Sequence, residues 1–473
     1  MFSAELFSRY LPLRHDEVQM TGRPDLLSQP VPQLLRRLAV PVGTGFFFNT
    51  MFNVVDTVYA GRISTQALAA LSLAFPLFFV IIALGAGILM AATALIGHSL
   101  GAGRREEAGL YAAQAVSFSL LHAILLMGMG VALAPLVFSL MGARGEYLGL
   151  AVDYMRVLFV GTPFFLGNYV FNAMLSASGD TRSFRNFLIG GFLLNLGLDP
   201  WFIYGGMGLP PLGLPGIAWA TIGVQFLGNC YMLRRAVVAG ILTTNSWRLL
   251  VPRRQPFARL FGQGFPASLN MLTVSLGIFV ITWFIGRYGQ AAVAAYGIAT
   301  RLEQIVLLPV MGLNVATLSL VAQNFGAGQF GRVTETVRTA FRGGLALMAG
   351  GSLLVFLGAG QLLHLFTTDH AVIDVGAGYF RINAFVLGAY VVLYVNNAAL
   401  QGLQKPAFAL WLGLFRQLAA PLAAFPLLAL HLGWGLTGIW WGIFLVTWVA
   451  AGISILYTRR VLRLMGQDAP VIS

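Results

Sequence analysis

Long apolar runs dominate this sequence, and short clusters of charge, glycine or proline separate them. A helix that crosses a bilayer needs about 20 mostly apolar residues, and twelve runs reach that length. They are too long, and too rich in Gly, Leu and Ala, for barrel strands, which alternate over about ten residues. The pattern predicts an all-α polytopic membrane protein. The twelve predicted transmembrane helices cover residues 34–60, 67–99, 109–141, 147–177, 184–204, 213–239, 258–286, 292–324, 334–367, 375–402, 407–431 and 435–462.

The two halves of the chain resemble each other at an offset of 225 residues. Pro41 faces Pro266, Gly87 faces Gly312, and the Gly-Ala-Gly segment at 101–103 faces the same segment at 326–328. Six spans per repeat leave both halves in the same orientation, so a pseudo-twofold axis along the membrane normal should relate them. Two six-helix lobes of this kind, facing each other across a cleft, form an alternating-access transporter.

The repeat and the apolar runs together predict the domain organisation. The N-lobe covers residues 34–239 and the C-lobe 258–462, with a cytoplasmic linker at 240–257. Residues 1–33 hold acids and prolines but lack the apolar core of a signal peptide, so we expect a cytoplasmic tail there. A second cytoplasmic tail covers residues 463–473.

Basic residues lie almost entirely on one side of the predicted helices. The loops and tails on the side of both termini carry 22 Lys or Arg, whereas the opposite loops carry only Arg62, Arg144 and Arg287. Since cytoplasmic loops collect positive charge, both termini are predicted to be cytoplasmic, in the bacterial inner (plasma) membrane. This asymmetry also accounts for the net charge of +13, so no nucleic-acid partner is expected.

Composition excludes a soluble enzyme of ordinary surface. Only 10% of the residues are charged and the mean hydropathy is +0.79, whereas soluble chains are about a quarter charged. The glycine-rich segments lack the Lys-Ser/Thr of a phosphate loop, and the histidines lack metal-ligand spacing. We therefore expect no enzymatic activity and no cofactor, and an ion gradient as the energy source.

The repeat breaks at polar positions inside the N-terminal half. A carboxylate within a span costs about 3 kcal/mol or more and is by default a functional hypothesis. Asp56 and Asp199 each lie about five residues before the outer end of a span, hence at one depth, where they could share a cation or a proton. Three polar residues, Asp56, Asn195 and Asp199, face the apolar residues Ile281, Ala420 and Ala424.

Oxygen-bearing side chains near these acids complete a candidate coupling site. Asn195 and Asp199 are four apart and share a helix face, and Thr221 enters at a similar depth. Such ligands suit H⁺ or a hard cation such as Na⁺, and no other metal is expected. In the alternative interpretation, Asp56 and Asp199 reach interfacial water or cap a turn, and Asn195 only stabilises helix packing through an interhelical hydrogen bond.

Other intramembrane polar residues admit two interpretations each. Tyr169 and Asn172 either line a substrate cavity or belong to the core and its hydrogen bonds, and Pro41 either fixes a kink or acts as a bending point. Two pairs are expected to be local ion pairs, and two arginines either lie near span ends or line the cleft. The pairs are Asp153 with Arg156 and Arg301 with Glu303; the arginines are Arg381 and Arg416.

Several stretches resemble the multidrug and toxic compound extrusion (MATE) family in their order and spacing over residues 34–460. The matching stretches are Asn53-Val54-Val55-Asp56-Thr57 with Gly61-Arg62, Leu100-Gly101-Ala102-Gly103, Asn172 with Gly179-Asp180-Thr181-Arg182, Asn195-Leu196-Gly197-Leu198-Asp199-Pro200 with Gly216-Ile217-Ala218, and Gln323-Asn324-Phe325-Gly326-Ala327.

The resemblance implies a twelve-helix antiporter of two lobes that exports organic, often cationic, compounds against H⁺ or Na⁺. It implies an N-lobe cation site at Asp56 and Asp199, completed by Asn195 and Thr221, and bending of the first span at Pro41. Some members also use acids in the seventh and tenth spans. Residues 258–286 and 375–402 contain no Asp or Glu, which indicates the DinF-like branch.

The sequence thus predicts a monomeric, ion-coupled efflux antiporter whose partners are small organic compounds and membrane lipids. The alternative is a flippase for a lipid or a lipid-linked oligosaccharide. A flippase predicts an arginine-rich cleft, for which the candidates are Arg156, Arg301, Arg381 and Arg416.

Overall fold

The computed structural model describes residues 24–242 and 246–467, and this part of the chain is helical throughout. Its β-structure is limited to one isolated bridge between Gly206 and Leu209. The N-terminal half contains α2 (Val31–Ile63), α3 (Thr65–Gly101), α4 (Arg105–Leu140), α5 (Gly145–Val160), α6 (Thr162–Ala177), α7 (Arg182–Tyr204) and α8 (Leu214–Val238).

The C-terminal half repeats this order with more interruptions. Its elements are η2 (Ser246–Leu250), α9 (Arg254–Ile285), η3 (Gly286–Tyr288), α10 (Gln290–Gly326), α11 (Phe330–Leu357), α12 (Ala359–His364), α13 (His370–Asn383), η4 (Ala384–Val386), α14 (Leu387–Gly402), α15 (Ala407–Leu414), η5 (Phe415–Ala419), α16 (Ala420–Phe425), η6 (Pro426–His431) and α17 (Gly435–Gln467).

Twelve spans can be assigned within the described residues. Ten helices, counting helices joined through short breaks as one, are long and apolar enough to cross a membrane, and α5 with α6, bent by 45°, forms an eleventh. Helix α8, with 25 residues, is the twelfth and corresponds in the repeat to α17. The prediction of an all-α polytopic protein is confirmed.

Helix ends differ from the predicted span ends because hydropathy follows only the apolar part of a helix. The first helix begins at Val31 rather than at 34, and the last extends to Gln467 rather than 462. The residues added at these ends include Gln33 and Arg463, which are good helix formers, so backbone hydrogen bonding continues beyond the apolar run.

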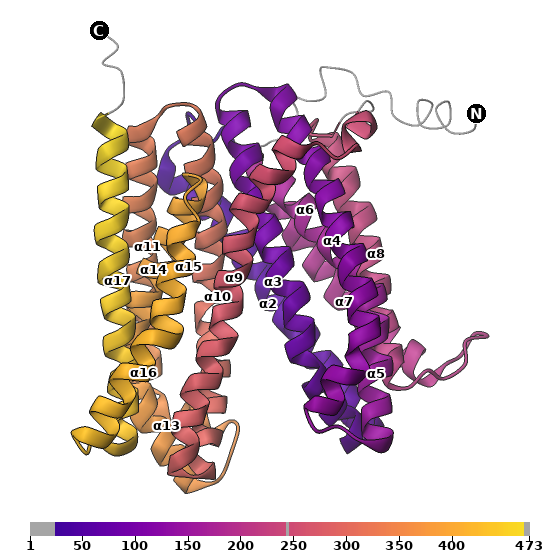
Figure 1. The fold of residues 1–473 in the computed structure, drawn as a ribbon, viewed down its shortest axis with the longest axis vertical. Helices are drawn as coiled ribbons and strands as arrows, with labels where there is room; N and C mark the ends of the chain where they lie inside the picture. Colours follow the sequence, from indigo (N-terminus) through magenta and orange to yellow (C-terminus); the bar gives the residue numbers. More distant parts are fainter. Residues whose placement is uncertain (1–23, 243–245, 468–473) are drawn as a thin grey trace.

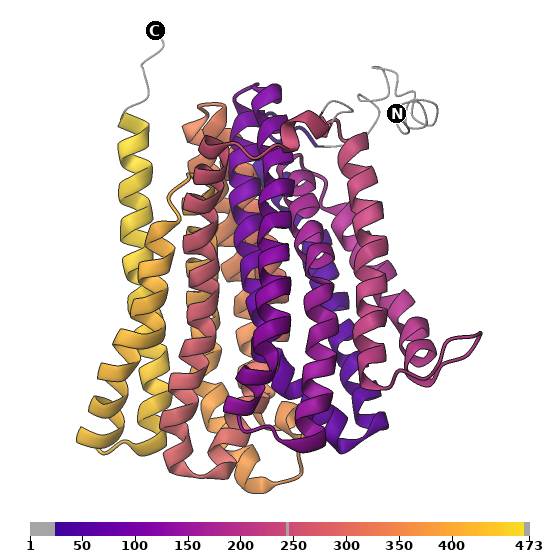
Figure 2. The same ribbon diagram turned by 45° about the vertical axis from the view of Figure 1, so that its right-hand side comes forward.

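The helices form two lobes that lie side by side. Both described ends of the chain are at the same end of the molecule, where the lobes meet, and the lobes diverge toward the opposite end (Figure 1). The segment between α8 and α9 crosses that same end (Figure 2). It is held on α4 by Gln114, which donates to the carbonyl of Val251 (2.7 Å) and accepts from the N–H of Arg253 (2.8 Å).

The lobes contact each other through paired glycines on α3 and α10. A Cβ atom on Gly101 would lie 1.9 Å from the carbonyl oxygen of Gln323, and one on Gly326 would lie 2.0 Å from that of His98. His98 and Gln323 are themselves equivalent in the repeat, as are the two glycines. The same backbone contact is therefore made twice, once on each side of the pseudo-twofold axis.

This axis passes between residues that the repeat makes equivalent. A Cβ atom on Gly97 would lie 3.0 Å from the Cβ of Ala322, and these two positions are 225 residues apart. The Gly-Ala-Gly segments follow directly, and their last residues, Gly103 (φ 73°) and Gly328 (φ 69°), adopt the left-handed conformation that favours glycine. One glycine of each segment thus serves the contact and the other serves the turn.

A second symmetric pair of contacts joins α3 to α9 and α10 to α2. A Cβ atom on Gly87 would lie 2.6 Å from the carbonyl oxygen of Gly264, and one on Gly312 would lie 2.3 Å from that of Ala39. All these contacts belong to the halves of the four helices near the end that carries the termini. The opposite halves are free of them, which lets the lobes diverge there.

The chain just before α2 adds an asymmetric contact between the lobes. Leu26 is buried beside Gly179 of the N-lobe, and its carbonyl accepts from Asn324 of α10 (3.2 Å). Arg332 of α11 donates to the carbonyl of Gln29 (2.8 Å). Part of the predicted N-terminal tail therefore packs into the lobe interface, while residues 1–23 lie outside the described chain.

Replacing Gly101 with alanine should weaken the lobe interface. The new methyl group would have to displace the Gln323 backbone, and overpacking of this kind costs about 1–3 kcal/mol. Thermal unfolding of the purified protein in detergent measures the effect. Gly128→Ala in α4 is the matched control, since no atom lies within 4 Å of its new methyl group; equal melting temperatures for the two variants would contradict the close contact.

Candidate functional site

Asp56 lies near the end of α2 that faces away from the lobe contacts. Its side chain is buried although several neighbouring α2 residues are exposed, and its Oδ1 atom has no hydrogen-bond partner. A buried polar atom without a partner costs about 1–3 kcal/mol. The buried Asp56 carboxyl group therefore lowers the stability of the fold, and a purely structural role does not explain it.

Asn195 and Asp199 occupy one face of α7, because they are one helical turn apart. Both are fully buried, and Asn195 Nδ2 donates to Asp199 Oδ1 (2.9 Å). Asn195 Oδ1 and Asp199 Oδ2 have no partner. Pro200, the next residue, lies within the helix and removes one backbone donor from this turn.

The structure brings these three side chains together. The carboxyl group of Asp56 lies within hydrogen-bonding reach of Asp199 and of the Asn195 amide. Two carboxylates at such a separation repel each other, and a proton or a small cation between them removes the repulsion. Three acceptor oxygens without donors fit H⁺ or an oxygen-ligated ion such as Na⁺.

Thr221 is also buried, on the neighbouring helix α8. Its hydroxyl donates to the carbonyl of Ile217 (2.9 Å), so its proton is used within its own helix and its lone pairs remain for a cation. Among the described hydrogen bonds, none joins Thr221 to the acids.

Tyr154 of α5 is a neighbour that the sequence did not single out. It is buried and interacts electrostatically with both Asp56 and Asp199. A tyrosine in an apolar span has no spacing that distinguishes it from core, so only the tertiary structure reveals this neighbour. Its phenol can donate to a carboxylate.

The two C-lobe positions equivalent to Asp56 and Asp199 are apolar. Ile281 and Ala424, the repeat partners of the two acids, pack against the C-lobe core. The scaffold is therefore symmetric and the acidic pair is not.

The C-lobe instead buries Glu303 of α10. Its Oε1 atom accepts from the hydroxyl of Tyr379 (2.5 Å) and from Nδ2 of Asn383. The predicted pair of Glu303 with Arg301 is wrong: no ion pair joins them within the described chain, and Arg301 is exposed. Residues two apart on a helix point in different directions, which the local prediction neglected.

The remaining predicted charges fall in separate places. Arg156 and Asp153 approach to 4.0 Å on an exposed face, as predicted for a local pair. Arg381 lines a cavity beside α12 in the C-lobe, and the Arg416 guanidinium lies 5.6 Å from the ring centre of Tyr390.

Tyr169 and Asn172 make packing contacts inside the N-lobe. The Tyr169 ring lies directly against Gly85 of α3, where a Cβ atom would approach it to 2.2 Å, and Asn172 accepts from Ser176 (3.1 Å) on its own helix. Their assignment to a substrate cavity stays a prediction.

Pro41 is buried inside a continuous α2. The same stretch of α2 packs on α10, where a Cβ atom on Gly43 would lie 3.5 Å from Pro309. A change of helix direction at Pro41 would therefore act directly on the lobe interface, although its role as a bending point stays a prediction.

Comparison with known proteins agrees with this architecture. The MatE family model matches the chain twice, at residues 41–201 and again at 266–424. This chain belongs to the MATE family. The two matches begin 225 residues apart, at Pro41 and Pro266, so the family unit is the lobe. The family consists of membrane transporters, which makes the chain an integral multi-pass membrane protein.

Relatives of this MATE protein have different named substrates. The FAD transporter of Shewanella oneidensis is 29% identical over 417 residues, which cover 86% of this chain and 90% of the relative. The probable multidrug resistance protein YoeA of Bacillus subtilis is 30% identical over 345 residues, 72% of each chain. A multidrug resistance MATE transporter solved in an outward-facing conformation has a TM-score of 0.86 at 26% identity and covers 95% of this chain and 99% of its own.

The Glu303 cluster allows a direct test of its hydrogen bonds. Tyr379→Phe removes one donor to a buried carboxyl group and should lower the free energy of unfolding by about 1–3 kcal/mol. Combined with Glu303→Gln, it should show a coupling energy of about 0.5–3 kcal/mol in a double-mutant cycle. Tyr457→Phe is the control, since this tyrosine stacks on Phe408 (3.8 Å between ring centres); additive effects of the first pair would contradict the contact.

Proposed function

We propose that this MATE protein is a secondary active exporter of small organic compounds, coupled to H⁺ or Na⁺ at Asp56 and Asp199. One observation carries the proposal: a buried pair of acids with unpaired oxygens occupies one lobe and has an apolar equivalent in the other. A purely structural pair would leave fewer unsatisfied acceptors, because each one is costly. We infer no cofactor besides the coupling ion.

The position of the two acids links ion binding to the lobes. Asp56 is on α2 and Asp199 on α7, so a proton or cation shared between them changes the interaction between these two helices. Helix α2 also contacts α10 of the other lobe through Ala39 and Gly312. Binding of the ion would therefore move α2, with Pro41 as the bending point, and this movement would alter the lobe interface.

The distribution of basic residues orients this cycle. With both termini in the cytoplasm, the end at which the lobes meet is the cytoplasmic end and the divergent end faces outward. The similarity to the outward-facing MATE structure supports this orientation. Outward protonation or Na⁺ binding would favour substrate release, and the return step would carry the ion inward.

The relatives support organic substrates without selecting one. YoeA is named as a multidrug resistance protein and the Shewanella relative as an FAD transporter. We propose that this chain transports small organic molecules as a monomer in the bacterial inner membrane, surrounded by lipid. We propose the DinF-like branch, because residues 258–286 and 375–402 contain no Asp or Glu; Asp374 lies near the start of α13, just before the second of these ranges.

The flippase alternative receives no support from the arginines. Arg156 is in the N-lobe beside Asp153, whereas Arg301, Arg381 and Arg416 are on three different elements of the C-lobe. We therefore favour the exporter.

Transport by Asp56→Asn in proteoliposomes tests the coupling. Wild-type protein should drive efflux of an organic cation such as ethidium in response to an imposed pH or Na⁺ gradient. The efflux rate of the variant should fall to the rate measured without a gradient, because an amide cannot ionise and therefore cannot bind and release the coupling ion as a carboxylate does. The comparison of pH with Na⁺ gradients identifies the ion. Undiminished gradient-driven efflux in the variant would contradict the proposed coupling at Asp56.

Glu303→Gln is the matched control for that experiment. It removes a buried carboxyl group of the other lobe, whose Oε1 already has two hydrogen-bond donors, so gradient-driven efflux should persist. Loss of coupling in Glu303→Gln together with its retention in Asp56→Asn would place the coupling group in the C-lobe instead.

A further inference from the structure

Arg416 is a charged residue deep inside a membrane span of the C-lobe. It is the tenth of the 25 residues from Ala407 to His431 and belongs to η5, a π-helical segment between α15 and α16. A charged side chain at such a position is costly, and π-helical turns within α-helices occur often at functional sites. The proposed ion coupling at Asp56 and Asp199 does not use this arginine.

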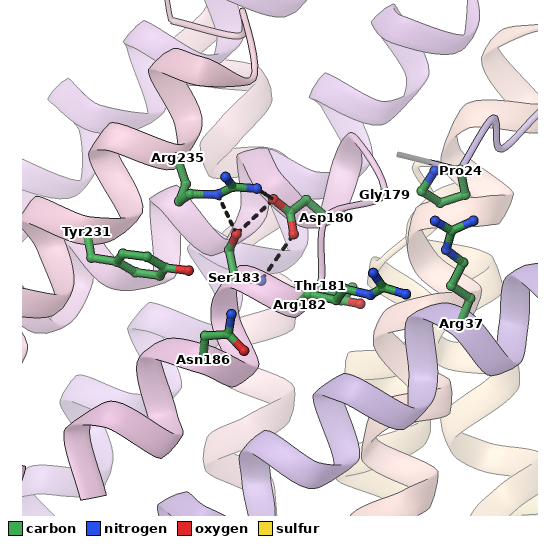
Figure 3. Close-up of a pocket in the computed structure, with 10 residues that line it drawn as sticks. All are labelled: Pro24, Arg37, Gly179, Asp180, Thr181, Arg182, Ser183, Asn186, Tyr231 and Arg235. Atoms are coloured by element: carbon green, nitrogen blue, oxygen red, sulfur yellow. Dashed lines mark hydrogen bonds and ion pairs between the residues drawn. The ribbon is translucent and has the colours of Figure 1, made fainter. Parts of the chain in front are cut away.

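Arg416 has no ion pair within the part of the chain that the structure describes. Its half-buried side chain places the guanidinium 5.6 Å from the ring centre of Tyr390 on α14, so it is held within the lobe and does not extend to the membrane surface. Arg235 of the N-lobe is different, because its Nη2 lies 2.9 Å from Asp180 Oδ2 and its Nε donates to the Ser183 hydroxyl (Figure 3). The guanidinium of Arg416 therefore keeps donors that Arg235 has already used.

Glu303, the buried acid of the same lobe, is engaged by other groups. Its Oε1 accepts from Tyr379 and Asn383. Glu303 and Arg416 both interact electrostatically with Tyr390, yet they form no ion pair with each other. The acid therefore lies in the same region without occupying the donors of the guanidinium.

Two tyrosine hydroxyls accompany Arg416. Tyr390 and Tyr394 are one turn apart on α14, are half-buried, and both interact electrostatically with the guanidinium. Neither hydroxyl donates a hydrogen bond among the described residues, and a guanidinium cannot accept one. The two phenol protons therefore remain available beside the positive charge. Tyr394 is also the repeat equivalent of Tyr169, for which a place in the substrate cavity is predicted.

The repeat makes this positive charge specific to the C-lobe. Position 416 corresponds to Gly191, four residues before Asn195 on the helix that also carries Asp199. A Cβ atom on Gly191 would lie 2.9 Å from the side chain of Val224, which leaves little room for a side chain there. Helix α7 thus contributes a carboxyl group to its lobe, and the corresponding C-lobe helix contributes a guanidinium group.

We propose that Arg416, with Tyr390 and Tyr394, forms an anion subsite that binds the carboxylate or phosphate group of an organic substrate. A guanidinium binds either group through paired N–H donors, and the tyrosine hydroxyls donate to the same oxygens. The inference rests on the proposed transport function and names a substrate class for it, organic compounds with a negatively charged group. The coupling ion binds in the N-lobe and the anionic group binds in the C-lobe.

Equilibrium binding to the full chain purified in detergent tests the subsite without a transport assay. FMN and riboflavin are a matched pair of probes, because they share one fluorescent ring system and differ by one phosphate group. Fluorescence anisotropy should show about tenfold or more tighter binding of FMN than of riboflavin to the wild type, since hydrogen bonds to charged groups contribute at that scale. Arg416→Gln should remove this preference by weakening FMN binding alone.

Three further variants separate the subsite from other causes. Arg381→Gln removes an exposed arginine beside α12 of the same lobe and should keep the preference for FMN. Arg416→Lys keeps the charge but loses the planar fork, so an intermediate preference with unchanged riboflavin binding shows that the fold is intact. Asp56→Asn should keep the preference even where gradient-driven efflux is lost, which distinguishes the subsite from the coupling site.

Two results would overturn the subsite. One is a wild type without preference for FMN over riboflavin, whether or not either flavin binds. The other is an Arg416→Gln variant that keeps the wild-type preference, which would leave the arginine with a structural role beside Tyr390.

Discussion

The architecture depends on close backbone contact between α3 and α10 across the pseudo-twofold axis. Only glycine allows a helix to approach a neighbouring carbonyl as Gly101 approaches Gln323 and Gly326 approaches His98. Small residues at helix crossings are the usual means of association where water cannot drive it. Because these contacts are confined to one end, they hold the lobes together there and leave the other end able to separate.

A symmetric scaffold carries asymmetric chemistry in this protein. Both lobes use the same glycines, prolines and turns, yet Asp56 and Asp199 have the apolar equivalents Ile281 and Ala424. Duplication supplies two matching bundles, and the acidic pair present in one of them is the basis of the proposed ion coupling. The buried Glu303 shows that the C-lobe diverged in its own way, with a carboxyl group supported by its neighbours.

The buried acids of the two lobes differ in their hydrogen bonding. Glu303 has two donors on one oxygen, whereas the N-lobe acids and Asn195 retain three unpaired oxygens. The hydrogen bonds to Glu303 are consistent with a structural role for this carboxyl group, whereas the unpaired oxygens in the N-lobe are the basis of the proposed exchange of a proton or an ion.

The spans, the repeat and the residues at which the repeat breaks can all be predicted from the amino-acid order, because membrane insertion requires long apolar runs and each buried charge is costly. Spacing along one helix also placed Asn195 beside Asp199. The contacts between different helices emerge only in the folded molecule: Asp56 with Asp199, Tyr154 near both, and Glu303 with Tyr379 rather than Arg301. These contacts depend on the rotation and crossing of helices, which no local pattern encodes.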